Sequence, residues 1–366
     1  MSQAVIDHFF AKQTVGLLST STDLALSKGY ALLDDKDGRL FLGGSFAPNR
    51  MSVNAPLHHI LTVGIKTNIK DQFATLAKGA DLQTDIGLSV KYTFAFGASI
   101  NYAKEDKVHK AKVRAFVKQQ SSLAATQTDQ WIKANALALE DNSALAVAKE
   151  KELKKQQRML VEKTADHVED EGLYTWLKAF WFSPEVYVPF TSSEYLVADS
   201  ITTNQPRSVN YNPINMGASL SGMVKSRRLG TFFLTVAAGR QLNNSVLADR
   251  MTKTSFESYR GRGGMDTLQF ARISENTVYI GQFKEFWTST LTGSLTWMFP
   301  GTIFGISGSV EQWYGEVEST NWKLGLPVSL HGKDKDKRVN FELQWRERFN
   351  THTVGISVGL PFGALL

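Results

Sequence analysis

The sequence predicts an all-β fold: an antiparallel up-and-down β-barrel of about 12 strands that carries an inserted two-helix hairpin. Two observations predict it. In many segments apolar residues alternate with small polar residues, which is the period-two pattern of strands. Between residues 103 and 172 a composition rich in Ala, Lys, Glu, Gln and Leu replaces that pattern and favours helices. The 366 residues suffice for one large barrel.

The clearest strands flank the Pro300-Gly301 turn. One face of the first strand carries Trp287, Leu291 and Leu295, and the opposite face carries only threonine and serine. A soluble sheet usually shows long charged side chains to water, whereas this polar face is short and uncharged. We therefore expect lipid against the apolar face and a polar lumen behind it.

The N-terminal part begins with a segment, residues 1–23, in which residues 2–18 form a short amphipathic helix or lid. The first part of the barrel covers 24–102. It includes regular strands near 59–69 and 86–97, both with one apolar face.

The helical insertion covers residues 103–172. It contains no proline, and Asp141-Asn142-Ser143 offers a helix break followed by an N-cap. We expect two antiparallel helices, over roughly 104–139 and 143–168.

The remainder of the barrel, 173–366, resumes the strand pattern. An even strand number places both termini on one side of the barrel. The short turns 227–230 and 299–302 then fall on the terminus side together with the helical insertion, and the polar loops 191–209 and 243–276 fall on the other side.

The bulk composition excludes several function classes. The chain has no cysteine, which excludes disulfides and thiolate chemistry, and its net charge of +6 comes without a basic block typical of nucleic-acid binding. No segment reaches the roughly 18 apolar residues of a membrane-spanning helix. Residues 1–19 also lack the apolar core of a secretory signal. This leaves open a processed chain, export without a cleaved signal, or a protein outside membranes.

Catalysis has little support in the sequence. HExxH, Walker, G-x-S-x-G and dinucleotide-binding patterns are absent. His58 and His59 are adjacent in a strand and point to opposite faces, so they do not suggest a metal site. We predict no enzyme activity, no cofactor and no metal.

Charged residues on the polar parity are expected to line the lumen. Their positive bias predicts a weak anion preference if the lumen is open, and the alternative is that they pair across a filled interior. These residues are Lys66, Lys91, Lys225, Glu311, Lys323, Glu342 and Arg346.

Tryptophans near strand ends are expected to form aromatic girdles at the lipid interface. The alternative is an aromatic soluble core. The residues are Trp176, Trp181, Trp287, Trp297, Trp322 and Trp345.

With these features the chain resembles outer-membrane-type transmembrane β-barrels over roughly 24–102 and 174–363. The last strand is similar to two insertion signals. Bacterial barrels often end on an aromatic residue, here Phe362, and organellar barrels carry a polar-x-Gly-x-x-hydrophobic-x-hydrophobic pattern. The second pattern is matched by Thr353, Gly355, Val358 and Leu360.

The resemblance implies a lipid bilayer and the barrel-assembly machinery as partners. It implies the outer membrane of a Gram-negative bacterium, favoured by the long polar loops, or else the mitochondrial outer membrane.

The expected function is a channel or porin-like transporter, with residues 103–172 as a plug or a docking element for a protein partner. One alternative is a non-conducting membrane scaffold or structural subunit of a larger envelope complex. Another is a soluble all-β component of a phage or secretion apparatus.

Overall fold

The structure is a computed structural model. It describes residues 2–15, 27–34, 39–48, 57–68, 77–78, 81–82, 86–101, 106–135, 142–200, 206–248, 250–264, 267–331, 338–348 and 351–364.

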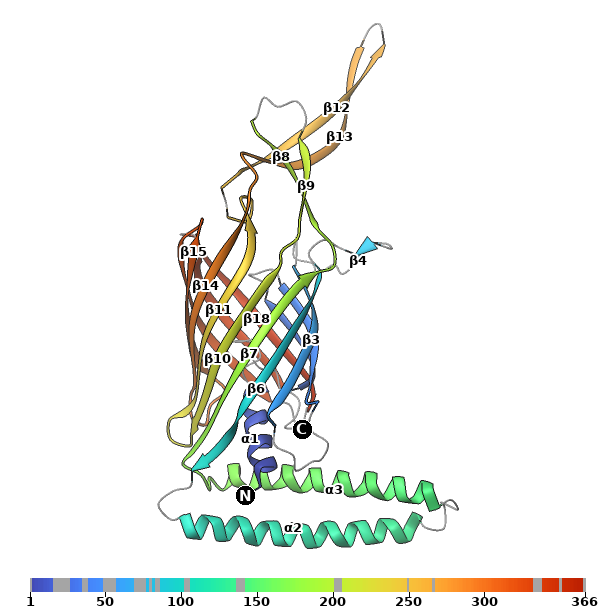
Figure 1. Ribbon diagram of the computed structural model, residues 1–366, viewed down its shortest axis with the longest axis vertical. Coiled ribbons are helices and arrows are strands. Elements are labelled where there is room, and N and C mark those ends of the chain that lie inside the picture. The colour runs from blue at the N-terminus through green and yellow to red at the C-terminus, as the bar shows by residue number, and fades with distance from the viewer. Residues whose placement is uncertain are drawn as a thin grey trace.

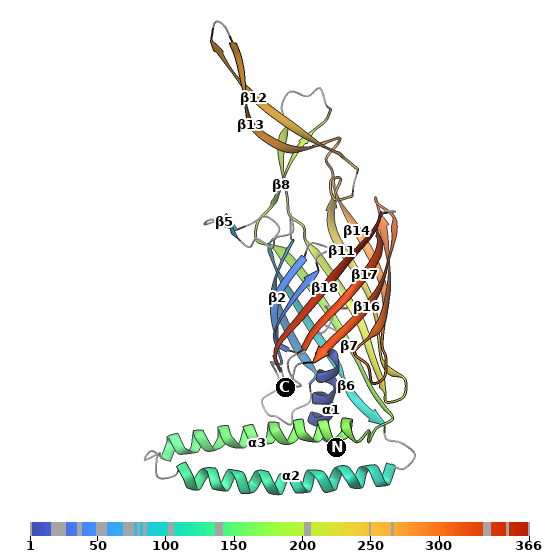
Figure 2. The same ribbon diagram turned by 180° about the vertical axis from the view of Figure 1, so that it is seen from behind.

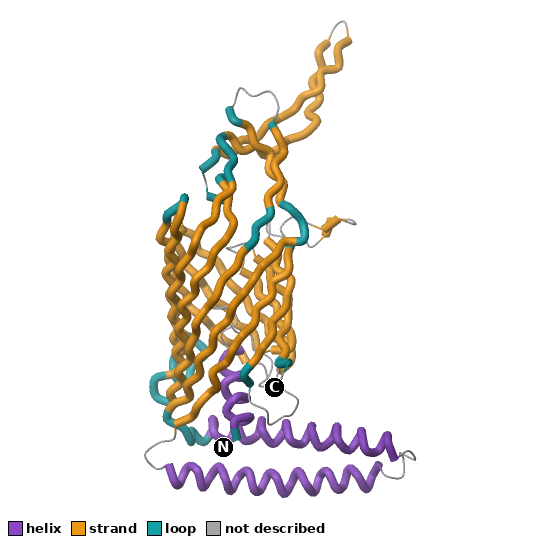
Figure 3. Tube along the Cα trace, in the orientation of Figure 1, coloured by secondary structure: helices purple, strands orange, loops and turns teal. Residues whose placement is uncertain are grey.

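Twelve antiparallel strands form a closed barrel in which every strand pairs with its neighbours in chain order and the last pairs with the first. This up-and-down arrangement confirms the predicted fold class (Figures 1 and 3). The barrel strands are β1 (Ser27–Asp34), β2 (Arg39–Phe46), β3 (His59–Asn68), β6 (Gly87–Asn101), β7 (Trp176–Pro189), β10 (Asn215–Ser226), β11 (Gly230–Asn244), β14 (Glu285–Met298), β15 (Gly305–Gly315), β16 (Ser319–His331), β17 (Arg338–Arg348) and β18 (Thr351–Ala364).

The helices gather at the end of the barrel where both termini lie (Figures 1 and 2). Helix α1 (Gln3–Val15) lies in the barrel mouth. The insertion forms α2 (Asp106–Asn135) and α3 (Asn142–Asp170), close to the expected helices, and the two run side by side beneath the barrel. Within the described residues, none of these helices combines the length and the apolarity needed to cross a bilayer.

At the opposite end, a second sheet extends beyond the barrel (Figure 1). Its strand order is β12-β13-β8-β9, and a two-stranded β4-β5 element lies apart from it. The expectation that 191–209 and 243–276 are plain loops was wrong. These strands pair with one another away from lipid, so they need no apolar stripe. Their bounds are β4 (Ala77–Lys78), β5 (Asp81–Leu82), β8 (Ser193–Ala198), β9 (Arg207–Tyr211), β12 (Thr252–Gly264) and β13 (Thr267–Ile280).

The outer wall of the barrel is an exposed apolar belt. Leu295 is 51% exposed and Val354 is 69% exposed, whereas Thr288 and Thr296 on the opposite parity are buried. A large exposed apolar surface of this kind is a feature of proteins that meet lipid or a partner. The apolar face of the wall therefore points outward and the face with hydroxyl side chains points inward, as in outer-membrane-type barrels.

Candidate functional site

The lumen holds a cavity of about 480 Å³. Charged and aromatic residues of β3, β6 and β7 line one wall, including Lys66, Lys91 and Tyr187. Glycine, serine, threonine and alanine line much of the adjoining wall, which is formed by β10, β11 and β14 and continues from β7 around the barrel. Because those side chains are short, the barrel keeps open space in its middle instead of filling it.

Two lysines on the first wall are held by neighbouring groups. Lys91 Nζ lies 3.4 Å from Glu185 Oε2, and Ser89 Oγ donates a hydrogen bond of 3.0 Å to Glu185 Oε1. Lys66 Nζ lies 5.7 Å from the centre of the Tyr187 ring, within cation–π range. A Cβ at Gly87 would come 2.5 Å from that ring, so glycine lets the ring lie flat against the wall.

A second charged group lies on β16 and β17. Lys323 Nζ is 3.2 Å from Glu342 Oε2, and Gln344 Nε2 donates to the same oxygen at 2.6 Å. Ser307 donates to the other carboxylate oxygen of Glu342, which is fully buried. Arg346 in turn donates to Gln344 Oε1 at 2.7 Å. This carboxylate is therefore compensated by a cation and hydrogen bonds, as buried charge requires.

Of the seven charges expected in the lumen, Lys66, Lys91 and Lys323 line the cavity. Glu342 and Arg346 belong to the network beside Lys323. Glu311 accepts a hydrogen bond of 3.4 Å from Asn321. Lys225 lies elsewhere, among the helices at the terminus-side mouth.

Helix α1 packs an apolar face against the inner wall at that mouth. Phe9 and Phe10 are almost fully buried. The Phe10 ring lies 5.4 Å from the Trp181 ring, and the Phe9 ring meets Tyr174 edge-on at 5.1 Å. Leu177, like Trp181, belongs to the same buried cluster. The helix in the mouth is thus α1, whereas the α2–α3 hairpin lies outside the barrel (Figures 1 and 2).

The expectation that Trp181 sits at the lipid interface was wrong, because its side chain is only 4% exposed and faces α1. Aromatic residues occupy both parities between 174 and 190, so alternation could not tell the inner face from the outer one. The apolar inner face exists here because α1 covers it.

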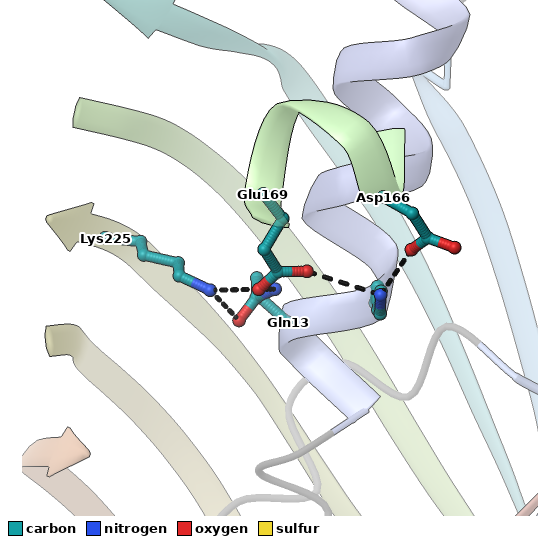
Figure 4. Close-up of polar contacts among 5 residues, drawn as sticks. Gln13, Asp166, Glu169 and Lys225 are labelled. Carbon is teal, nitrogen blue, oxygen red and sulfur yellow. Dashed lines mark hydrogen bonds and ion pairs between the residues drawn. The ribbon is translucent and has the colours of Figure 1, made fainter. Parts of the chain in front are cut away.

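An ion-pair cluster, which we call the latch, joins α1, α3 and the barrel (Figure 4). Lys12 of α1 lies 2.5 Å from Asp166 and 3.3 Å from Glu169, both on α3. Lys225 of β10 lies 2.6 Å from Glu169 and donates to Gln13 Oε1 at 2.8 Å. The sequence missed this cluster because its members are distant in the chain and look like ordinary surface charges.

Electrostatics favour the charged form of the latch. Burial by itself raises the pKa of Glu169, but the nearby charges of Lys225 and Lys12 and their hydrogen bonds outweigh it and lower the pKa to about 2. Burial lowers the pKa of Lys12, but Asp166 and Glu169 outweigh it, so that pKa is raised. Both groups are therefore charged at neutral pH.

The other five tryptophans predicted for the lipid interface lie on the outer surface of the barrel in two bands. Trp176 and Trp297 are near the terminus-side ends of their strands, and Trp297 Nε1 donates to the Leu229 carbonyl at 2.7 Å. The other three are near the opposite ends. The ring centres of Trp322 and Trp345 lie 5.0 Å apart there. The guanidinium carbon of Arg240 lies 5.2 Å from the centre of the Trp287 ring.

The proposed insertion signal lies on β18, whose pairing with β1 closes the barrel. Phe362 is 55% exposed on the outer surface, and Val358 and Leu360 share its parity. Thr353 and Gly355 lie on the other parity. In the part of the chain that the structure describes, no group of three or more His, Asp or Glu could hold a metal ion.

No protein-family model matches the chain, and no curated protein matches it in sequence. Among solved structures, the β-domain of the Bordetella autotransporter BrkA aligns with 91% of this chain and 96% of that one, at 7% identity and a TM-score of 0.26. A TM-score this low does not establish a shared fold. The closed ring of strand pairs establishes the barrel by itself.

Proposed function

We propose that this protein is an outer-membrane channel for small polar solutes and that α1 plugs its terminus-side mouth. The observation that carries the proposal is the cavity of about 480 Å³ inside the lumen, whose lining includes lysines, a glutamate and many hydroxyl groups. Ser183, which lines the cavity, is two residues from Trp181, which contacts Phe10 of α1. The plug therefore borders the space that a solute would cross.

We further propose a weak preference for anions. Three lysines line the cavity, with Glu185 as the carboxylate on the same surface. The pairs that Lys91 and Lys323 make with carboxylates offset much of the positive charge, so the preference should be small. A reversal potential under a salt gradient measures it, and cation selectivity would contradict it.

Removal of α1 tests the channel proposal. The full chain and a variant lacking residues 2–15 are reconstituted in planar bilayers, with heat-dependent mobility in SDS gels as the check on barrel folding. We expect rare openings for the full chain and sustained conductance for the variant. A double variant, Phe9→Ala with Phe10→Ala, guards against misfolding of the deletion and should conduct more often than the full chain. Variants that fold but show no conductance would contradict the proposal.

The second candidate is a non-conducting scaffold in a larger envelope complex. It is favoured by the α2–α3 hairpin and the outer sheet, which extend from opposite ends of the barrel and offer surface to partners (Figure 1). Folded barrels that do not conduct even without α1 would support this second candidate. The soluble alternative does not fit an outer wall with Leu295 and Val354 more than half exposed.

We place the protein in the outer membrane of a Gram-negative bacterium, with the mitochondrial outer membrane as the alternative. The large sheet opposite the termini supports the bacterial location, since bacterial barrels carry long outer loops and short periplasmic turns. Lipid and the barrel-assembly machinery are the partners that this location implies. We propose neither catalysis nor a cofactor.

A further inference from the structure

One face of α3 carries a stripe of charge that changes sign along the helix. Steps of three and four residues place its members on a single face. Two of them, Asp166 and Glu169, contact Lys12 and Lys225, so this face is turned toward the barrel. From the N-terminal end, the stripe reads Lys151, Lys155, Arg158, Glu162, Asp166 and Glu169.

The change of sign coincides with the edge of the barrel. The C-terminal half of α3 lies under the barrel, and its N-terminal half extends past the barrel wall in both views (Figures 1 and 2). Asp166 and Glu169 thus lie under the barrel mouth, where they meet α1. Lys151 and Lys155 belong to the half of α3 that extends past the wall, and Arg158 lies just after the helix midpoint. Around a membrane barrel, the space beside the wall belongs to lipid.

The basic residues are accessible. Lys151, Lys155 and Arg158 are all exposed. Lys155 also makes an i,i+3 ion pair of 3.5 Å with Glu152, with 65% of the Lys155 side chain exposed. An exposed pair of this kind is weak and leaves the ammonium available to a phosphate.

The stripe also lies at the depth of the membrane interface. Glu169 contacts Lys225, which is one residue from the end of β10. The last residue of β10, Ser226, pairs in register with Trp176. Trp176 belongs to the terminus-side aromatic band, and such bands mark the headgroup level. The barrel-facing side of α3 therefore meets the barrel near the level of the lipid headgroups.

We infer that α3 binds anionic phospholipid headgroups of the terminus-side leaflet through Lys151 and Lys155 of its N-terminal half and Arg158, which follows the helix midpoint by two residues. Basic residues beside a membrane are attracted to anionic lipid within about a Debye length. The contact fixes the overhanging part of the hairpin against the membrane, while the acidic half of the same face holds α1.

The absence of cysteine makes this inference testable with a single label on the full chain. Val147, four residues before Lys151, is 68% exposed. A polarity-sensitive fluorophore on Val147→Cys is read in phosphatidylcholine vesicles with and without phosphatidylglycerol. We expect phosphatidylglycerol to shift the emission to shorter wavelength and high salt to reverse the shift.

Two triple variants decide the outcome. The first variant combines Lys151→Gln, Lys155→Gln and Arg158→Gln. Its affinity for anionic lipid should fall on the order of 100-fold at low salt, and the emission shift should disappear. The control changes three exposed basic residues of α2, the helix farther from the barrel, and should keep the shift: Lys107→Gln, Arg114→Gln and Lys118→Gln. No response to phosphatidylglycerol, or equal loss in both variants, would overturn the inference. Circular dichroism checks that both variants keep their helices.

Discussion

The latch should control how often α1 leaves the barrel mouth. In the variant Glu169→Gln the side chain keeps its size and loses its charge, so Lys12 and Lys225 lose the carboxylate that they share. The pKa of Glu169 falls from 4.5 to about 2 in the folded protein. That difference corresponds to about 3 kcal/mol in favour of the charged, latched state.

Apolar contacts limit how much Glu169→Gln can weaken the attachment of α1 to the barrel mouth. Phe9 and Phe10 are buried almost completely, and each contributes roughly 2–3 kcal/mol through apolar burial. These contacts remain in Glu169→Gln, so α1 should stay in the mouth most of the time. Its excursions should become more frequent by up to about 100-fold, and the barrel itself should stay folded.

Thiol labelling measures those excursions. Ala11 is 6% exposed, so a cysteine introduced there reacts only when α1 moves out. We expect faster labelling of Ala11→Cys in the Glu169→Gln background. The control, Glu171→Gln, removes an exposed carboxylate two residues away and should leave the rate unchanged. Equal rates in wild type and Glu169→Gln would refute the role assigned to the latch.

The same latch predicts a pH dependence. Because the pKa of Glu169 is lowered, its stabilising effect is complete above its ordinary value of 4.5 and is lost as pH falls toward about 2. Channel opening in planar bilayers should therefore rise over this acidic range. Glu169→Gln should show a smaller rise, and an equal rise in both proteins would count against the assignment.

Two further pairs of substitutions, each a test and its control, concern the barrel itself. Gly230 has φ +83°, and a Cβ there would collide with the Met298 carbonyl oxygen, so Gly230→Ala should cost about 1–3 kcal/mol or more and lower the folded fraction in heat-shift gels. Gly301→Ala is the control, because its φ is +67° but a Cβ would meet open space. Phe362→Ala should slow insertion by the barrel-assembly machinery, whereas Val354→Ala on the same outer face should not. Equal insertion rates for the last two variants would remove Phe362 from the proposed signal.

The regular strands were readable from the sequence because lipid and lumen impose opposite demands on alternate residues. On β14, Leu291 and Leu295 alternate with threonines, and no other arrangement satisfies both solvents. The helical insertion was equally readable, since its composition departs from that pattern over its whole length. Near Trp181 the alternation did not indicate which face points inward, because the inner face is aromatic there and is covered by α1, a contact that no local pattern contains.

The sequence alone therefore determined the barrel, its approximate strand number, the helical insertion and the side on which each connection lies. These follow from local periodicity, which each segment carries by itself. Only the tertiary structure decided that α1 enters the mouth, that Lys12, Glu169 and Lys225 meet, and that Lys91 and Lys323 pair with carboxylates in the lumen. Such contacts join residues far apart in the chain, and their energies depend on the distances and burial that folding alone creates.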